Sequence, residues 1–186
     1  MLKSLLIAAS ISISTAAQAT ELLFAHQIQQ IQAAVGTMGL TWKVGDTNNY
    51  KLNMGFIKGT MVMSVREITA DGLWMVQDID LMIQKQKVEV LLDINTGEVK
   101  KMLVNGQEQQ VPASDYELIE QKEATVTVPA GTFKAIYIKI KDNANNGSIT
   151  EQWVNPRDIP LSGMIKSLAD SQLGKVTIEL NSFKRN

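Results

Sequence analysis

The sequence predicts a mainly β (α+β) fold, in which an N-terminal helix leads into a long antiparallel meander curved into a half-barrel or barrel. Two observations carry this prediction. Apolar residues recur at steps of three and four up to Gly36, and the apolar period changes to two beyond Gly39. Most junctions between the alternating segments contain Asn-Gly, Asp-Gly or similar pairs, which are typical of short links between antiparallel strands.

Residues 1–19 have the pattern of a secretory signal peptide. Lys3 precedes an apolar run from Leu5 to Ile13, and Ala17-Gln18-Ala19 forms a small-x-small cleavage site. The run is shorter than the roughly 20 residues that a membrane-spanning helix needs. We therefore expect cleavage after Ala19, a periplasmic location, and a single β-rich domain over residues 20–186.

Composition argues against several classes of protein. Without Lys3, the mature chain keeps 17 of the 18 basic residues against 19 acidic ones, a net charge of −2. It therefore lacks the strongly basic face that nucleic-acid binding needs. The chain has no cysteine, which excludes thiol catalysis, thiolate metal sites and a lipidated N-terminal cysteine. An exported domain without disulfides must be stabilised by core packing.

The segment from Thr20 to Val35 is expected to form an amphipathic helix. Thr20 can cap its start, Gly36 can end it, and glutamines occupy much of the face opposite the apolar stripe. The simplest arrangement packs this helix into the concave face of the sheet. His26, the only histidine, lies at the edge of the stripe without a nucleophile or orienting carboxylate nearby, which favours a structural or surface role.

Alternation and turn residues define the expected strands. They are Thr41–Val44, Tyr50–Ile57, Thr60–Ile68, Leu73–Ile83, Val88–Asp93, Val99–Val104, Tyr116–Gln121, Ala124–Val128, Phe133–Lys141, Ser148–Val154 and Lys175–Phe183. One face of the sheet is expected to be apolar and the other solvated. The apolar face includes Leu52, Met54, Phe56, Met61, Met63, Val65, Leu73, Met75, Ile79, Leu81, Val176, Ile178 and Leu180.

The segment Val126–Phe133 reads Val-Thr-Val-Pro-Ala-Gly-Thr-Phe, and alternating residues follow from Ala135 to Ile140. It resembles a hairpin in a group of poorly characterised exported bacterial β-rich proteins, in which a later strand carries a Trp followed by a Pro-containing segment. Glu151–Pro156 and Ile159–Lys166 match those later elements, and Trp42–Asp46 resembles the opening strand of the group. The resemblance implies an exported β-rich fold, and its motifs are structural.

A helix leading into a long meander is also similar in architecture to the periplasmic lipoprotein localisation factors, whose curved open barrel holds acyl chains. This resemblance implies a concave face suited to an apolar ligand. Neither resemblance assigns a functional residue to this chain, because one scaffold hosts many functions.

Methionine is frequent in the mature chain. The residues are Met38, Met54, Met61, Met63, Met75, Met82, Met102 and Met164. Thioethers can bind Cu(I), and Met61 and Met63 point to one side of a strand, but the methionines are dispersed without a metal-binding cluster. Core packing accounts for much of this pattern. Unbranched side chains that repack easily also suit a cavity that adapts to flexible acyl chains.

Carboxylate pairs raise a second hypothesis. Asp78 and Asp80 project from one face of a strand, and Glu89 and Asp93 lie on a neighbouring one, so a two-acid hydrolase is conceivable. A solvated strand face explains the same pattern and is favoured. The chain contains no Gly-x-Ser-x-Gly, phosphate-binding glycine loop or His-Glu-x-x-His.

The apolar segment from Ile159 to Ile165 is the least strand-like part of the chain. It fits a lid at a pocket mouth, or a loop that touches a membrane with Lys166 near the headgroups. A buried crossover to the last strand is the favoured interpretation.

These features favour a non-enzymatic periplasmic binding or carrier protein, holding a lipid or other apolar ligand in a curved sheet, with no cofactor or metal. Membrane contact is expected to be transient at most. The expected ligand-binding residues are Met54, Phe56, Met61, Met63, Met75, Ile79, Leu81, Leu161 and Met164. The alternatives are a protein-interaction module of the cell envelope, using a sheet edge or the 159–165 segment, and a carboxylate-dependent hydrolase.

Overall fold

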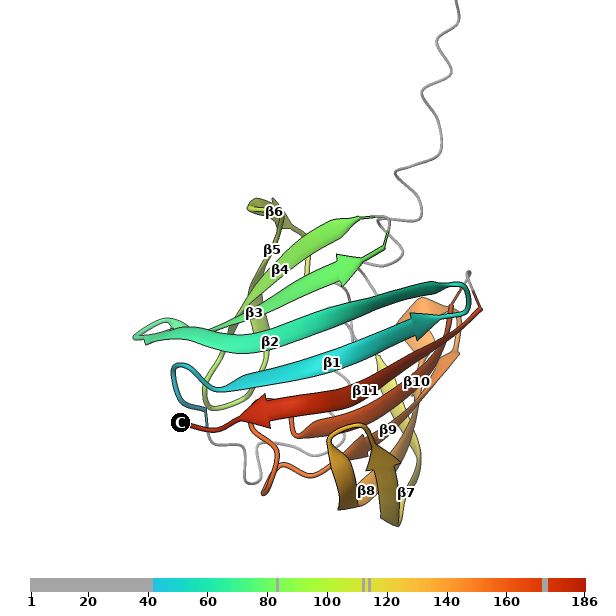
Figure 1. The fold of residues 1–186 in the computed structure, drawn as a ribbon. Helices are drawn as coiled ribbons and strands as arrows, with labels where there is room; N and C mark the ends of the chain where they lie inside the picture. The colour runs from blue at the N-terminus through green and yellow to red at the C-terminus, as the bar shows by residue number, and fades with distance from the viewer. Residues whose placement is uncertain (1–41, 83, 112, 114, 172–173) are drawn as a thin grey trace, which may run out of the picture.

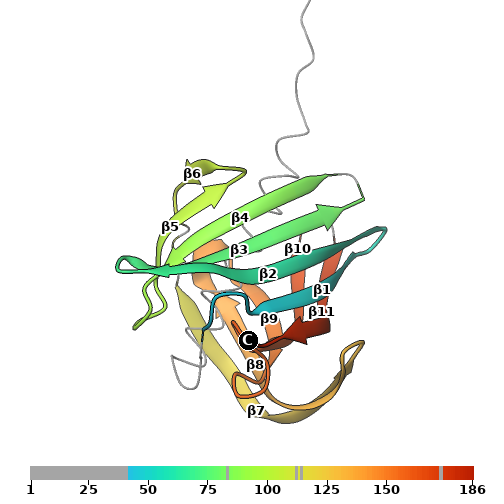
Figure 2. The same ribbon diagram turned by 60° about the vertical axis from the view of Figure 1, so that its left-hand side comes forward.

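A computed structural model describes residues 42–186 except 83, 112, 114, 172 and 173. Eleven strands within this range form one antiparallel sheet with the order β6-β5-β4-β3-β2-β1-β11-β10-β9-β8-β7. The elements are β1 (Thr47–Met54), β2 (Ile57–Thr69), β3 (Gly72–Leu81), β4 (Lys85–Leu92), β5 (Val99–Val104), β6 (Gln107–Gln109), β7 (Tyr116–Val128), β8 (Gly131–Asp142), the 3-10 turn η1 (Asn143–Asn145), β9 (Ser148–Val154), β10 (Met164–Ser171) and β11 (Gly174–Lys184). The sheet is strongly curved (Figures 1 and 2) and does not close into a barrel, because its outer strands β6 and β7 are not paired with each other.

The order of the strands differs from a simple meander. Strands β1 to β6 run outward to one edge, the chain then crosses to β7 at the far edge, and β7 to β11 return to the middle. There β1 pairs antiparallel with β11 from Thr47 opposite Lys184 to Asn53 opposite Thr177. The predicted antiparallel meander is confirmed within β1–β6 and within β7–β11, but the sheet is open between β6 and β7, and the first and last strands are neighbours at its centre.

Most predicted strands are confirmed, with three corrections. Residues 42–44 are not a strand, because the amide of Asp46 bonds back to the carbonyl of Lys43 in a turn. The segments predicted at 116–121 and 124–128 form the single strand β7, whose register shifts between Leu118 and Glu120. Strand β10 was not predicted, because its inward positions include the small or polar Ser167 and Ala169 and the register breaks between Met164 and Lys166.

The predicted signal peptide and the predicted helix from Thr20 to Val35 lie outside the described residues.

The turn predictions are confirmed at several hairpins. At the β5–β6 hairpin, Asn105 and Gly106 have φ of 50° and 81°, as a two-residue Asn-Gly turn requires. Asn146 and Gly147 have φ of 54° and 70°.

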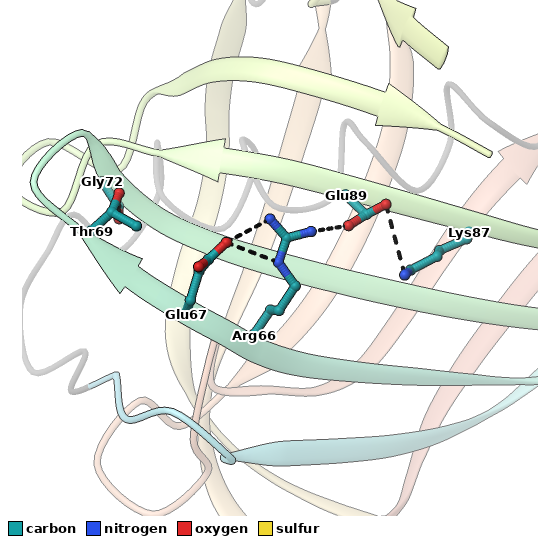
Figure 3. A network of polar contacts seen from close by, with 6 residues as sticks. All are labelled: Arg66, Glu67, Thr69, Gly72, Lys87 and Glu89. Carbon is teal, nitrogen blue, oxygen red and sulfur yellow. Dashed lines mark hydrogen bonds and ion pairs between the residues drawn. The ribbon is translucent and has the colours of Figure 1, made fainter. Parts of the chain in front are cut away.

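Side chains of one face of the sheet form a single buried apolar cluster, to which strands from both halves contribute. This face, called the inner face below, carries Met61 and Met63 of β2 together with Met75 of β3. Arg66, Trp74 and Glu89 lie on the opposite side of the sheet. Figure 3 shows Arg66 and Glu89 in front of β2 to β4, with strands of the other half of the sheet behind, so the apolar cluster is on the concave side.

Candidate ligand-binding face

Eight of the nine residues predicted to bind a ligand lie together in the buried cluster of the inner face. They are Met54, Met61, Met63, Met75, Ile79, Leu81, Leu161 and Met164, each at most 4 % exposed. The pairing of β1, β2 and β3 explains this grouping. Met61 lies between Tyr50 and Ile79, and one step along the strands Met63 lies opposite Gln77. Alternation along a strand is therefore sufficient to place these side chains on the apolar face.

Phe56 is the exception, and its predicted position on the apolar face is wrong. The β1–β2 hairpin turns at Gly55 and Phe56, where Gly55 has φ of +73° and Met54 pairs with Ile57. Phe56 therefore leaves the alternation of β1, and it is 84 % exposed. Met82, at the end of β3, is 77 % exposed, and its amide bonds to the carbonyl of Lys58 beside the same hairpin. Two large apolar side chains thus project at one end of the sheet.

The 159–165 segment is buried, as the favoured interpretation expected, so the alternative of a membrane-touching loop is wrong for this stretch. Ile159, Leu161 and Ile165 are fully buried, and the segment leads into β10 rather than into the last strand. Hydrogen bonds join it to β1 and to the residues before β1. The Nε1 atom of Trp42 donates to the carbonyl of Leu161 (3.2 Å), and Nδ2 of Asn48 donates to the carbonyl of Pro160 (2.9 Å).

Tyr50 joins this loop to the inner face. Its hydroxyl donates to the carbonyl of Met164 (3.0 Å) and accepts from Nδ2 of Asn48 (3.0 Å). Burial raises the pKa of Tyr50 far above its ordinary value, although hydrogen bonds with Asn48 and Ser162 oppose this shift. The phenol is therefore neutral throughout the physiological range. Its role in this geometry is to hold the loop.

Buried polar side chains interrupt the apolar inner face, and the sequence analysis missed them. Gln77 of β3 and Gln86 of β4 are 1 % and 7 % exposed, and Ser167 of β10 is 1 % exposed. The amide atoms of both glutamines and Oγ of Ser167 have no hydrogen-bond partner among the described residues. The one signal in the sequence was that Gln77 falls between Met75 and Ile79 in the alternation of β3. The pairing that sets Gln77 opposite Val88 and Gln86 opposite Ile79 is visible only in the structure.

The outer face of β2 to β4 carries a charged network (Figure 3). A register shift between Val65 and Glu67 places Arg66 and Glu67 on the same face of β2. The guanidinium of Arg66 bonds to Glu67 and to Glu89 of β4, and it lies 4.7 Å from the ring centroid of Trp74. The Glu89 side chain is only 10 % exposed. Arg66 therefore neutralises a largely buried carboxylate.

The other candidate acids do not converge. Asp78 and Asp80 are exposed on the outer face, and Asp80 pairs with Lys85 (2.9 Å). Asp93 lies in the β4–β5 turn, where hydrogen bonds from Lys100 and from the backbone amides of Thr96 and Asn95 lower its pKa well below the usual range. No group of three or more His, Asp or Glu side chains in the described part of the chain is placed to hold a metal.

No protein-family model matches the chain, and no curated protein matches its sequence. Several solved structures are similar to it in part, two of which are described here. A protein from Bacteroides fragilis, inferred to be exported and described as having a YmcC-like fold, matches with a TM-score of 0.41 and 11 % identity over 78 % of this chain and 98 % of its own. MucB matches with a TM-score of 0.41 and 12 % identity over 90 % of this chain and 58 % of MucB.

These similarities are in the backbone fold, and they assign neither a ligand nor a functional residue to this chain. Within the described residues, no helix has the length and apolar character to cross a membrane.

Proposed function

We propose that this chain is a periplasmic, non-enzymatic binding or carrier protein for a lipid or other ligand with apolar chains, held against the inner face of its curved sheet. The observation that carries the proposal is the grouping of six methionines (Met54, Met61, Met63, Met75, Met102 and Met164) in one buried cluster. Methionine side chains have several rotatable bonds and repack at low cost, so such a face can adapt to flexible chains.

The charge distribution supports the same proposal. Strands β3 and β4 keep their charged side chains, such as Asp78, Lys87 and Glu89, on the outer face, and they present an inner face of apolar and neutral polar residues. Ligand sites in proteins are mostly apolar with a few polar groups that orient the ligand. The signal-peptide pattern of residues 1–19 supports a periplasmic location for this function.

The direct test is whether the native protein carries lipid. Protein purified from the periplasm without detergent should show a bound mass by native mass spectrometry and yield extractable lipid. After delipidation it should bind a fluorescent fatty-acid probe that lipids displace. Substitution of Met61 by Asp, which places a charge in the cluster, should abolish probe binding if the variant folds. A bare polypeptide that binds no probe would contradict the proposal.

Transient membrane contact would involve Phe56 and Met82, because these exposed side chains share one end of the sheet whereas the 159–165 segment is buried. Ligand exchange with a bilayer at this end follows as part of the proposal. Vesicle co-sedimentation should weaken when both residues are replaced by Ser, with fatty-acid probe binding in solution unchanged by the same substitutions.

A second candidate function is a protein-interaction module. The sheet is open, and its edge strand β7 is 13 residues long with Leu118 and Ile119 about half exposed. An unpaired strand edge can accept a strand from a partner. The register shift beside Ile119 and the charges of Glu117 and Lys122 oppose this, since bulges and charges protect strand edges. Crosslinking in whole cells that captures one stoichiometric protein, from a protein that carries no lipid, would favour this candidate.

A further inference from the structure

The inner face contains a pair of buried amides whose hydrogen-bonding capacity is unused. Gln77 pairs in register with Val88, and Gln86 pairs with Ile79, so the two glutamines are diagonal neighbours on the same face of β3 and β4. Diagonally neighbouring residues of two antiparallel strands lie about 7–8 Å apart, and their Cβ atoms lie somewhat closer. Each side chain carries two donor hydrogens and one acceptor oxygen, and none of these groups meets a partner in the described chain.

Such groups are costly when nothing binds them. A buried polar group left without a hydrogen bond destabilises a protein by roughly 1–3 kcal/mol. Apolar residues at the same two positions would continue the pattern of Met75 and Ile79 and would avoid this cost. Two such amides side by side therefore point to a bound partner that supplies the missing hydrogen bonds.

Ser167 adds a third such group on the other half of the sheet. Its hydroxyl is buried without a partner, and in register it lies opposite Gln152 of β9 and Ile178 of β11. Strands β3 and β10 are separated in the sheet by β2, β1 and β11. Because the sheet is curved (Figure 2), their inner faces turn toward each other across the concave side.

The charge of the partner follows from what surrounds these groups. Strands β3, β4 and β10 place no charged side chain on the inner face in the described residues, since Asp78, Lys87 and Lys166 all lie on the outer face. A carboxylate or phosphate buried there would lack a cation to offset its desolvation. Amide groups can instead pair with a neutral group that both donates and accepts.

We infer that the ligand of the inner face is an amphiphile whose apolar chain carries a neutral amide or hydroxyl group, bound by Gln77 and Gln86, with Ser167 facing it from the other half of the sheet. This inference rests on the proposed function and specifies its ligand class. The methionines contact the chain, and the amides fix its depth and direction.

The test measures how well three ligands displace a fluorescent fatty-acid probe: N-palmitoylethanolamine, palmitate and hexadecane. Their hydrocarbon chains have the same number of carbon atoms. The wild-type protein should bind N-palmitoylethanolamine about tenfold more tightly than hexadecane, because one or two neutral hydrogen bonds are worth about 1 kcal/mol each. Palmitate at neutral pH should show no such advantage over hexadecane.

The substitutions Gln77→Met and Gln86→Met keep the side-chain length and remove the polar atoms. Singly and together, they should reduce the preference for N-palmitoylethanolamine over hexadecane toward unity. They should also raise the Tm of the unliganded protein, since a buried unpaired amide is removed. The matched control is Gln109→Met on the exposed strand β6, which makes the same chemical change away from the inner face and should alter neither quantity.

Equal binding of N-palmitoylethanolamine and hexadecane to the wild-type protein would overturn the inference. A preference for N-palmitoylethanolamine that persists in both Gln→Met variants would overturn it too. Neither result would contradict lipid carriage. Buried water, rather than a ligand, would then be the partner of the amides. If none of the three ligands displaces the probe and the protein purified from the periplasm carries no extractable lipid, the proposed function fails instead. The two failures are therefore distinguishable.

Discussion

At the scale of single residues, the most informative contact is the one between Arg66 and Glu89 on the outer face. Glu89 keeps a carboxylate that is only 10 % exposed, while the Arg66 side chain is 40 % exposed and packs over Trp74. An ion pair between fully exposed groups contributes little, but removing the cation from a largely buried carboxylate leaves an uncompensated charge. The loss of stability on removing Arg66 therefore reports how strongly the Glu89 carboxylate is shielded from solvent.

We expect Arg66→Met to lower the free energy of unfolding by about 1–3 kcal/mol, because the buried carboxylate loses its principal hydrogen-bond donor. Lys87, whose Nζ is 3.8 Å from the other oxygen of Glu89, offsets part of the loss. In the double variant Arg66→Met, Glu89→Met the loss should be smaller than the sum of the single losses. Urea denaturation of the four proteins measures this coupling. Losses that add to within about 0.5 kcal/mol would contradict a direct interaction.

At the scale of the elements, the loop between β9 and β10 has no helix or strand but is held by several hydrogen bonds. The amide of Asn155 bonds to the carbonyl of Gly163, and the amide of Gly163 bonds to the carbonyl of Pro160. Leu161 has φ of +60°, a conformation that costs a residue with a side chain about 1–2 kcal/mol. The hydrogen bonds from Trp42 and Asn48 compensate for this strain and close the loop over the core.

Gly163 tests how tightly this loop is packed. A Cβ atom at Gly163 would lie 2.7 Å from both Cα and N of Pro156, whereas one at Gly55, which has a similar positive φ, would meet nothing within 4 Å. Gly55→Ala should therefore cost only the conformational strain, about 1 kcal/mol. Gly163→Ala should cost roughly 1–3 kcal/mol more, because backbone atoms must move.

Urea midpoints of the two glycine variants, measured with equal denaturant slopes, give the comparison directly. Equal losses at Gly163 and Gly55 would show that the loop between β9 and β10 relaxes freely around an added methyl group.

At the scale of the whole molecule, the pairing of β1 with β11 joins the two halves of the sheet. Strands β1 to β6 and β7 to β11 are each continuous in sequence, and the described contacts between them run mainly through this central pair. Because each half contributes to one apolar cluster, neither can keep its side chains buried alone. The sheet should therefore unfold as one cooperative unit.

Two single-tryptophan proteins test this cooperativity. Trp74 reports on the first half and Trp153 on the second, once the other tryptophans are replaced by Phe. After correction for the effect of the substitutions on stability, fluorescence and far-UV circular dichroism should give one urea midpoint in both proteins. A separate, earlier transition seen only by one tryptophan would show that its half of the sheet unfolds independently.

Local signals accounted for much of the fold. The period of two marked the inner-face positions from Leu52 to Leu81, and the Asn105-Gly106 and Asn146-Gly147 pairs marked hairpins. Local signals failed where a side chain left the regular pattern. Phe56 continues the apolar alternation in the sequence but lies in a turn. Strand β10 lacks a clear apolar alternation because Ser167 and Ala169 occupy inward positions.

The sequence by itself determined the β content, the main turns and the apolar face, because alternation and positive-φ residues act over only a few positions along the chain. Only the tertiary structure decided that β1 pairs with β11, that the sheet stays open, and that Gln77 and Gln86 are buried side by side. Those features depend on which distant strand supplies each neighbour. A glutamine in an alternating strand has the same local preferences whether it faces solvent or the inside of a curved sheet, so its burial is set by strand pairing across the molecule.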